Sequence, residues 1–188
     1  ELLDAFPVRL LQKKEGCWQE VFITPAEGGL RECLQPLSLS PGDAFSALSQ
    51  PLLAEGQRVE LHACVREWLH DWTPHWREGA MLTIDYGELA AKLYLRRPRG
   101  TLRAYFMHQR LEGPSIYENV GRQDLTADVN FTDYRNWGRE LGLQEAFFGS
   151  QAEFIRMFQP KAEGPLMDPE GAGGAFKVVV HEKVQAVP

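Results

Sequence analysis

The chain has 188 residues, a net charge of −6 and 44% hydrophobic residues, which fits one globular domain, or one domain with a small lobe, and excludes a disordered chain. The acidic balance argues against general binding to nucleic-acid phosphates, and no apolar run reaches the roughly 18 residues that a membrane span needs. No secretory leader is visible, and an odd number of cysteines without a CxxC pair fits reduced thiols in a cytosolic or organellar protein.

The first residues predict a small antiparallel meander. The chain opens on Glu1 rather than Met and enters an apolar stretch at once, as if it began partway through a domain. Val8 to Leu11 is a short apolar run, Trp18 to Thr24 alternates in the manner of a strand, and a Gly-Gly turn precedes Leu30 to Leu34. A helix is expected over 44–53, after a loop that contains Pro41.

The next elements are a strand and an aromatic helix. A short strand over Arg58–Leu61 leads into a helix that Pro74 interrupts. The apolar positions of that helix follow helical spacing and are Val65, Trp68, Leu69 and Trp72. The series Trp68, Trp72 and Trp76 offers a stacking platform, although aromatics at this spacing usually pack in a core.

A buried strand is expected over Ala80 to Ile84, because the run is apolar almost without alternation, as in a parallel sheet covered by helices on both faces. Asp85-Tyr86-Gly87 then falls at the carboxyl end of the strand, where open α/β sheets hold their ligands. The stretch from Leu89 to Leu125 is irregular and rich in Arg, Tyr and Gly. It is long for a structureless connection, which favours a functional loop.

The remaining third continues the alternation of strands and helices, which is typical of an α/β fold. Asn130 or Thr132 can cap a helix that runs to Leu141 and ends at Gly142. The expected elements after it are a strand over 143–148, a helix over 151–158, a loop rich in Pro and Gly over 160–174, and a closing strand over 175–184.

Two familiar kinds of site are not supported. His70 and His75 are five residues apart with Pro74 between them, so they miss the spacing that places two ligands on one helix face, and we expect no metal site. The basic stretch 96–100, with Arg103 and Tyr105 nearby, could bind phosphate or single-stranded nucleic acid. The acidic total and the absence of an aromatic-plus-basic strand pattern argue against it.

Four short motifs carry the polar chemistry. Glu1–Val8 has two carboxylates three residues apart, and Ile84–Gly87 ends the buried strand. Gly100–His108 offers a cation, a phenol and an imidazole, and Gln123–Phe131 precedes a helix. Taken singly, each motif is consistent with a solvated loop or a helix cap. Taken together and in this order, they resemble the MidA-type family of S-adenosylmethionine-dependent methyltransferases, which includes the mitochondrial complex I assembly arginine methyltransferase.

The resemblance runs along the whole chain. The family pattern Asn-Glu-x-x-Asp-Ala-x-Pro-Val matches Glu1–Val8 without its Asn, and Leu-x-Ile-Asp-Tyr-Gly matches Leu82–Gly87. Gly-Thr-Leu-Arg-x-Tyr-x-x-His matches Gly100–His108. Gln-Asp-Leu-Thr-Ala-His-Val-Asp-Phe matches Gln123–Phe131, except that Asp128 replaces the His and Asn130 replaces the Asp. The tail matches at 150–154 and 176–178.

The resemblance implies an α/β fold, namely the C-terminal half of a class I (Rossmann-like, seven-stranded) methyltransferase fold with an inserted antiparallel β meander. In the class I sheet order 3-2-1-4-5-7-6, this chain would supply strands 5, 7 and 6. The family's glycine-rich cofactor loop and ribose-binding acid are absent from the sequence. We expect one partial domain over 1–188, with the meander at 7–36, core elements at 57–158 including the loop 89–125, and the closing strand at 175–184.

The resemblance also implies a reaction, a methyl transfer from S-adenosylmethionine, with a protein arginine as the acceptor in the full-length protein. A guanidinium is protonated at neutral pH, so carboxylates are needed to orient it and to help remove a proton. By family position the catalytic candidates are Glu1, Asp4, Asp85 and Tyr86, and the cofactor-binding candidates are Glu1 and Leu2. The candidates in the substrate loop are Arg103, Tyr105, His108, Asp124, Thr126 and Asp128.

Several expectations follow for partners and location. We expect a protein substrate, no nucleic acid and no membrane, in the bacterial cytoplasm or in mitochondria if the protein is eukaryotic. The chain alone should be inactive and should bind S-adenosylmethionine weakly or not at all. A homodimer through the edge of the Ala80–Ile84 strand is expected, unless the meander covers that edge. The alternatives are a non-catalytic scaffold that binds a partner through Leu89–Leu125, and a methyltransferase that acts on a small molecule or RNA.

Overall fold

The structure is a computed structural model that describes residues 1–40, 43–51, 53–95 and 97–184. The chain divides into two compact units. The first unit comprises Glu1–Asp4, Cys64–Leu89 and the chain from Val129 onward, and the second comprises Ala5–Ala63 and Ala90–Asp128. Segments that are far apart in the sequence therefore pack together within each unit. No helix within the described ranges is both long and apolar enough to cross a membrane.

The first unit is built on a sheet with the strand order β10-β11-β5-β9. Its strands are β5 (Gly79–Glu88), β9 (Val129–Asn130), β10 (Gln144–Ser150) and β11 (Phe176–Lys183). β11 runs antiparallel to both β10 and β5, whereas β9 pairs in parallel with β5 only at Gly87 and Glu88. Along 79–86, β5 is therefore hydrogen-bonded on one side only, within the part of the chain that the structure describes. The edge expected for this strand is confirmed.

The expectation that Ala80–Ile84 is buried on both faces of a parallel sheet is wrong. The strand pairs with an antiparallel neighbour, and the side chain of Leu82 is 52% exposed. Burial becomes complete only near the carboxyl end, at Asp85 and Gly87. A continuous apolar run shows that a strand can be covered on both faces, but it does not show which neighbouring elements are present to cover it.

The helices of the first unit are η1 (Leu3–Ala5), α1 (Ala63–Trp72), η3 (Thr73–His75), α3 (Phe131–Glu140), α4 (Gln151–Phe158), η5 (Pro165–Met167) and α5 (Ala172–Ala175). α3 and α4 lie where the sequence predicts helices, whereas the loop expected over 160–174 is wrong in part, because it contains η5 and the start of α5. Asn130 caps α3 through its side-chain oxygen, and Ser150 forms a reciprocal capping box with Glu153 at the start of α4. Val65 and Leu69 are the buried face of α1, and its tryptophans are half-buried and stacked, with 5.8 Å between the rings of Trp68 and Trp72.

The core of the first unit is aromatic. The rings of Phe131 and Tyr134 on α3 meet edge to face at 6.1 Å, and the Tyr134 ring lies 5.4 Å from the imidazole of His181 on β11. The Tyr134 hydroxyl lies 2.7 Å from the hydroxyl of Thr83 on β5. Burial raises the pKa of Tyr134 to about 12, so its phenol stays neutral. These contacts fix α3 on β5 and β11.

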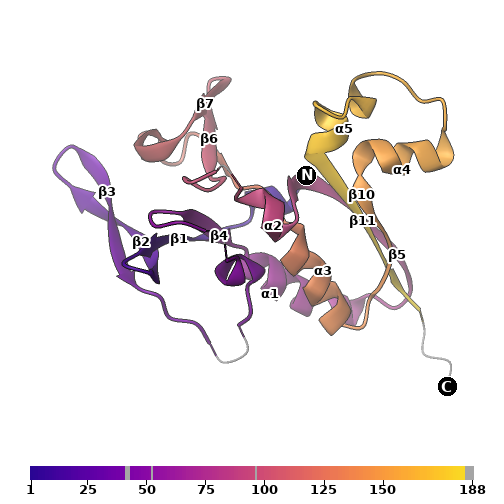
Figure 1. Ribbon diagram of the computed structural model, residues 1–188, viewed down its shortest axis with the longest axis horizontal. Coiled ribbons are helices and arrows are strands. Elements are labelled where there is room, and N and C mark those ends of the chain that lie inside the picture. The colour runs from indigo at the N-terminus through magenta and orange to yellow at the C-terminus, as the bar shows by residue number, and fades with distance from the viewer. Residues whose placement is uncertain (41–42, 52, 96, 185–188) are drawn as a thin grey trace. The chain divides into compact units, whose positions relative to one another are not determined.

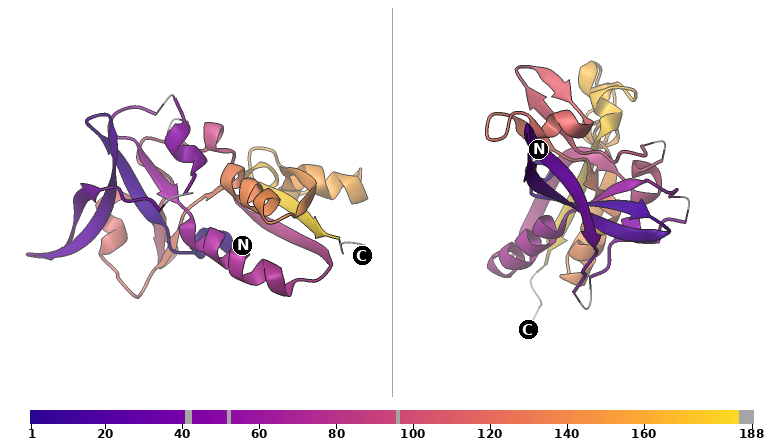
Figure 2. Two further views of the ribbon diagram at one scale, coloured as in Figure 1. Left: turned by 90° about the horizontal axis from the view of Figure 1, so that it is seen from below. Right: turned by 90° about the vertical axis from the view of Figure 1, so that its left-hand side faces the viewer.

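The second unit contains the expected meander, as a sheet with the order β3-β2-β1-β4. Its strands are β1 (Arg9–Lys14), β2 (Cys17–Ala26), β3 (Gly29–Pro36) and β4 (Arg58–Leu61), all antiparallel to their neighbours. Leu11 lies between Glu20 and Val59 in the register and is fully buried, as is Val59. The hairpin of β2 and β3 extends beyond the rest of this sheet (Figures 1 and 2).

The helix expected over 44–53 is not formed. Only a 3-10 turn, η2 (Ser46–Ser49), occurs there, and Pro41, Gly42 and Leu52 lie outside the described residues. The side chains of Ser49 and Gln50 both donate to the carbonyl of Ser46. Such local bonds compete with the backbone hydrogen bonds of an α-helix.

The segment expected to be an irregular loop from Leu89 to Leu125 is instead ordered, so that expectation is wrong. It contains α2 (Ala90–Leu93), β6 (Arg103–Phe106), β7 (Gln109–Leu111), η4 (Gly113–Tyr117) and β8 (Asp124–Thr126). The three strands form a small antiparallel sheet with the order β7-β6-β8. Strands of three or four residues are too short to show a hydrophobic period, which is why the sequence pattern does not reveal them.

Candidate functional site

The candidate residues form two groups, one in each unit. The first group is organised by Asp85, near the carboxyl end of β5, whose side chain is completely buried. Its Oδ2 accepts the backbone N–H groups of Leu2 at 3.0 Å, Leu3 at 2.8 Å and Asp4 at 3.4 Å. Its Oδ1 accepts the N–H of Tyr86 at 2.8 Å. One carboxylate thus holds the backbone of the first residues of the chain.

Burial dominates the electrostatics of Asp85 and raises the pKa of its carboxyl group. The backbone N–H groups of Leu2 and Leu3 partly offset that effect because they stabilise the charged form, whereas the charge of Asp4 opposes ionisation. The hydrogen bonds of Asp85 are directed to the backbone. Its function in this arrangement is to fix a segment rather than to present a free carboxylate.

The segment that Asp85 holds carries three of the predicted site residues. Glu1 is exposed, Leu2 is 56% exposed, and Asp4 is half-buried. Tyr86 also belongs to this group, and its ring packs on Phe176 at the start of β11 with 4.0 Å between the ring centres. The structure therefore brings Glu1, Leu2, Asp4 and Tyr86 together around Asp85.

Three further residues of the first unit were not predicted as site residues. Gly87 has a φ of 152°, and a Cβ atom there would lie 2.1 Å from the carbonyl oxygen of Val129, so only glycine fits where β9 meets β5. Lys177 lies opposite Asp85 in the register, and its ammonium group lies 3.3 Å from a carboxylate oxygen of Glu88. Gly87 and Lys177 belong to matched motifs and Glu88 follows one, so membership of a motif is the signal that could have identified them.

The second group lies on one face of the small sheet. The register pairs Arg103 with Thr126 and Tyr105 with Asp124. Alternate residues of a strand point to the same side, so these four side chains share a face, which we call the polar face. Arg110 lies opposite Tyr105 on the other side of β6 and extends the same row.

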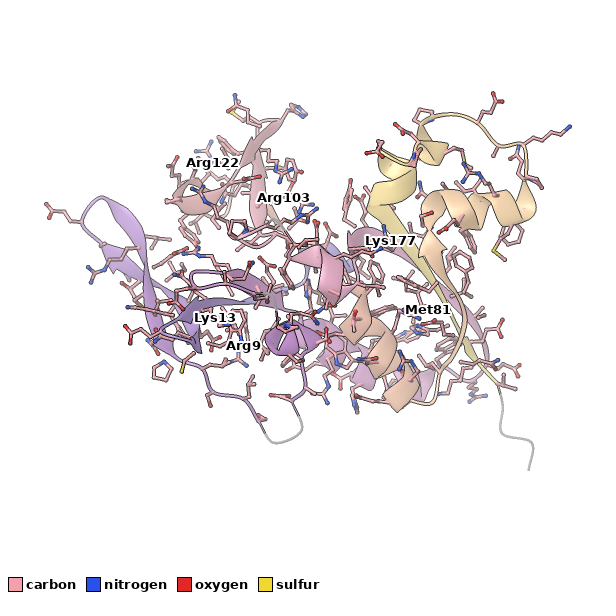
Figure 3. The ribbon with its side chains drawn as sticks, in the orientation of Figure 1. Arg9, Lys13, Met81, Arg103, Arg122 and Lys177 are labelled. Carbon is pink, nitrogen blue, oxygen red and sulfur yellow. The ribbon has the colours of Figure 1, made fainter. Side chains whose placement is uncertain are left out.

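Asp128 joins the polar face through an ion pair. Its two oxygens each lie 2.5 Å from a guanidinium nitrogen, one of Arg103 and one of Arg97. The Arg103 side chain is 8% exposed and also donates from Nε to the hydroxyl of Tyr105 at 3.2 Å. Figure 3 labels Arg103, which lies on β6, and Arg122, which precedes β8 in the chain; the Arg122 guanidinium packs over the ring of Phe106 at 5.5 Å.

His108 is placed apart from this cluster. It forms the tip of the β6–β7 hairpin together with Met107, and both residues have positive φ angles, 63° and 49°. This conformation normally favours glycine or asparagine in a two-residue hairpin turn. The structure thus assembles Arg103, Tyr105, Asp124, Thr126 and Asp128 on or beside one face, with His108 at an exposed tip.

The two departures from the motif pattern have structural explanations. Asp128 serves as the shared acceptor for two guanidinium groups, a role that an imidazole, with at most one acceptor nitrogen, would not fill. Asn130 accepts the N–H groups of Thr132 and Asp133 at the start of α3 and donates its amide to the Asp133 carboxylate at 2.9 Å. An aspartate at this position would place two carboxylates against each other.

The chemistry available is that of carboxylates and guanidinium groups. In the described ranges, no group of three His, Cys, Asp or Glu residues could hold a metal ion. Asp4, whose backbone N–H donates to Asp85, and Glu1, which directly precedes Leu2, carry carboxylates that are suited to hold a cationic group and to accept a proton from it. Leu2 offers an exposed apolar side chain beside them.

Comparisons with known proteins point to one family. Residues 1–148 match the family described as S-adenosyl-L-methionine-dependent methyltransferase. Over 147 residues, the chain is 34% identical to a protein of Drosophila melanogaster named "Protein arginine methyltransferase NDUFAF7 homolog, mitochondrial", which covers 76% of this chain and 32% of that protein.

Solved structures agree with this match. An uncharacterized protein from Burkholderia thailandensis superposes with a TM-score of 0.83 at 25% identity, covering 97% of this chain and 53% of the other. A superfamily member from the same organism, bound to S-adenosyl-homocysteine, gives the same TM-score and identity and covers 97% and 52%. The chain therefore spans about half the length of these structures, and about a third of the Drosophila protein.

Proposed function

Because the chain belongs to the S-adenosyl-L-methionine-dependent methyltransferase family, we propose that it forms part of an enzyme that methylates a protein arginine. The name of the Drosophila relative supports this acceptor, and so does the pair of carboxylates at Glu1 and Asp4. Family membership favours an enzyme over the scaffold alternative. When bound, S-adenosylmethionine supplies an electrophilic methyl carbon that moves to the acceptor nitrogen and leaves a neutral sulfide.

The first unit offers residues that suit this cofactor. Leu2 has an exposed apolar side chain, and Glu1 has an exposed carboxylate that can accept hydrogen bonds from an ammonium group. Both side chains project from a backbone that Asp85 fixes by hydrogen bonds. We assign Glu1 and Leu2 to cofactor binding on this basis, together with the superfamily member bound to S-adenosyl-homocysteine.

Glu1 and Asp4 are the proposed catalytic residues. A guanidinium is protonated at neutral pH and becomes a nucleophile only as it loses a proton. Two carboxylates can orient the planar group and accept that proton as the new N–C bond forms. Asp85 is the positioning residue for both, because its carboxylate accepts the N–H of Asp4 and of the residues between them.

The acceptor side is assigned to Tyr86 and the polar face. Tyr86 follows Asp85 directly and is held by its contact with Phe176, so it can line the substrate side. Arg103, Tyr105, Asp124, Thr126 and Asp128 present cations, carboxylates and hydroxyls on one small sheet, with His108 at its tip. Such a surface suits a protein acceptor, whose backbone and side chains offer complementary groups.

The sheet of the first unit supports the proposed larger fold. β5, β11 and β10 are neighbours in that order, and β11 is antiparallel to the other two. We assign them to strands 5, 7 and 6 of a seven-stranded class I sheet. The remaining strands would come from a longer protein, in line with the half-length coverage of the solved structures. The bacterial cytoplasm and the mitochondrion remain the proposed locations, the latter matching the name of the Drosophila relative.

The observation that carries the proposal is the hydrogen bonding of Asp85 to the segment Glu1–Asp4. The test is a methylation assay with the full-length protein, labelled S-adenosylmethionine and cell extract, with mass spectrometry of the labelled products. We expect label on arginine side chains of protein. Label found only on RNA, small molecules or other side chains would contradict the proposed acceptor.

A further inference from the structure

Glu60 is a buried carboxylate that the proposed function does not use. It lies in β4 of the second unit, and its side chain is 1% exposed. Its Oε1 accepts the backbone N–H groups of Thr101 at 2.7 Å and of Leu102 at 3.0 Å. Its Oε2 accepts the Thr101 hydroxyl at 3.0 Å. A single carboxylate therefore holds the turn that leads into β6.

The burial of the Glu60 carboxylate costs free energy, which its hydrogen bonds must offset. Within the described residues no cation forms an ion pair with Glu60, and a buried carboxylate without a counterion is strongly disfavoured. Burial raises the pKa of Glu60, although its hydrogen bonds to Thr101 and Leu102 oppose that effect. Neutral hydrogen-bond donors from one turn thus provide the compensation.

The backbone approaches this carboxylate more closely than a side chain would allow. Gly100 has a φ of 76°, and a Cβ atom there would lie 2.3 Å from Oε1 of Glu60. The glycine of the Gly-Thr-Leu-Arg motif is therefore required by the contact with Glu60, as well as by its positive φ. The two features hold the turn before β6 in a fixed position against the Glu60 side chain of β4.

Thr101 connects this anchor to the polar face. Its hydroxyl donates to Glu60 and accepts the backbone N–H of Asp128 at 3.0 Å. Its carbonyl accepts from Nη1 of Arg103 at 3.2 Å, and the same nitrogen lies 2.5 Å from Oδ1 of Asp128. Both partners of the buried ion pair thus contact Thr101.

We propose that Glu60 is a positioning residue for the polar face, acting through Thr101 to set the geometry of the Arg103–Asp128 ion pair. The hydrogen bonds of Glu60 to the turn, and of the turn to both members of the ion pair, carry this inference. That the correct geometry serves acceptor binding rests on the proposed function. The positioning itself does not, and it can be tested on this chain.

The first experiment measures the hydrogen exchange of the Arg103 Nε–H by NMR in the 188-residue chain. Thr101→Val keeps the shape of the side chain but removes the hydroxyl, and Glu60→Asp keeps the charge but shortens its reach. Each should accelerate exchange by about tenfold or more, because the ion pair and the Tyr105 contact loosen. Thr101→Ser keeps the hydroxyl and should restore the slow exchange of the wild type.

Glu32→Asp is the matched control. Glu32 is a partly buried carboxylate in the same unit that accepts from Arg58 and from the Tyr117 hydroxyl, and no hydrogen bond joins it to Thr101. The same chemical change there should leave the exchange of Arg103 unaltered. If Thr101→Val and Glu60→Asp both left it unaltered, the positioning role would be overturned. If Glu60→Asp fails to fold, the pair Thr101→Val and Thr101→Ser still decides.

The second experiment uses the full-length enzyme and separates binding from chemistry. Thr101→Val should raise the KM for the protein acceptor about tenfold and leave the KM for S-adenosylmethionine unchanged, with Thr101→Ser near the wild type. Equal changes in both constants would show a general structural role and contradict positioning for the acceptor. A wild-type enzyme without arginine methylation would refute the proposed function alone, because the exchange measurement does not depend on activity.

Discussion

The carboxylate of Asp85 accepts the backbone N–H of Leu3 at 2.8 Å, across 82 positions of sequence. The same oxygen also accepts from Leu2 and Asp4, so one buried side chain determines where the first residues of the chain lie relative to β5. In the second unit, Glu60 holds the turn at Thr101 and Leu102 in the same way. In each unit, a buried carboxylate that binds backbone N–H groups supports the residues that carry the candidate chemistry.

The first prediction concerns the proposed catalytic carboxylates. In the full-length enzyme, Glu1→Ala and Asp4→Asn should each reduce methyl transfer about tenfold or more, a loss of transition-state stabilisation of about 1.4 kcal/mol. The reason is that the guanidinium loses an orienting partner and a proton acceptor. The measurement is kcat/KM with the identified acceptor. Unchanged turnover in both variants would remove the catalytic assignment.

The second prediction concerns Asp85 as a positioning residue. Asp85→Asn replaces a carboxylate by an amide that cannot accept from Leu2, Leu3 and Tyr86 at once. We expect faster amide exchange at Leu2, Leu3 and Asp4 and a reduced kcat. Asp71→Asn, at an exposed carboxylate on α1, is the control and should alter neither. Normal protection of those amides in Asp85→Asn would contradict the role.

The pH dependence of Asp85 has a definite sign. Its pKa is raised in the folded chain, so the folded state binds a proton more readily than the unfolded state. The stability it contributes is present at low pH and is lost as the pH rises through its folded pKa. Asp85→Asn should remove this contribution, which would appear as a flatter dependence of unfolding free energy on pH in the acidic range.

The third prediction concerns His181, which is fully buried on β11. Its ring packs on Tyr134 and against Gly138, where a Cβ atom would lie 2.5 Å from Nε2. Burial lowers its pKa; the charge of Glu145 opposes this, and those of Arg135 and Arg139 reinforce it. The unfolded state therefore binds the proton more readily, and stability should fall as the pH drops below about 6.5, by at most about 1.4 kcal/mol per pH unit.

Denaturant unfolding of the chain between pH 5 and pH 7.5 measures this dependence. His181→Leu cannot titrate and should lose that part of the pH dependence, while its stability at pH 7.5 can be compared directly with that of the wild type. His75→Leu, which replaces an exposed histidine, provides the control, because it separates the effect of the buried position from that of losing a histidine. An equal slope in wild type and His181→Leu would assign the effect to other groups.

The sequence predicts best those elements whose signals are local. The limits of α4 match the predicted helix over 151–158 to the residue, and the structure shows that a capping box of Ser150 and Glu153 marks its start. α3 and β11 are predicted almost as closely. The small sheet is missed because the pairing of Tyr105 with Asp124 joins short strands that are nineteen positions apart in the chain, and a pattern read along the chain does not reveal such pairing.

In the candidate site, too, the sequence predicts the features with local signals and misses those that depend on contacts between distant segments. The motifs identify Asp85 and the segment that it holds. They do not reveal that both oxygens of its carboxylate accept backbone N–H groups. Glu60 gives no sequence signal, because a glutamate in the short strand Arg58–Leu61 looks like an outward-facing residue. Its burial depends on the turn at Gly100, which is forty positions away and becomes its neighbour only in the folded unit.

The fourth prediction concerns the cofactor. In the proposed fold, the glycine-rich loop and the ribose-binding acid expected of the family would lie outside this sequence, and they would supply most of the polar contacts to the cofactor. We expect no saturable binding of S-adenosylmethionine or S-adenosylhomocysteine to the 188-residue chain at about 100 µM, a threshold of about −5.5 kcal/mol. Isothermal titration calorimetry tests this. A tighter site would contradict the argument that half of the binding site is missing.

The last prediction concerns the edge of β5. Along 79–86 the strand is paired with β11 on one side only among the described residues, because β9 pairs with it only at Gly87 and Glu88. Leu82 is 52% exposed on this edge strand, and the stacked tryptophans of α1 are half-buried in the same unit. An apolar, unpaired strand is a template for pairing with another chain. We therefore expect the 188-residue chain to dimerise through Ala80–Ile84 and the tryptophan helix, whereas strand 4 of the proposed sheet would cover this edge in the full-length protein.

Light scattering at high micromolar concentration measures the mass of the particle in solution. Leu82→Lys should shift the chain to a monomer, because a charge on an edge strand opposes pairing, while Leu95→Lys, at a leucine of similar exposure in the second unit (57%), should leave the dimer intact. A monomeric wild type under these conditions would refute the edge-pairing argument.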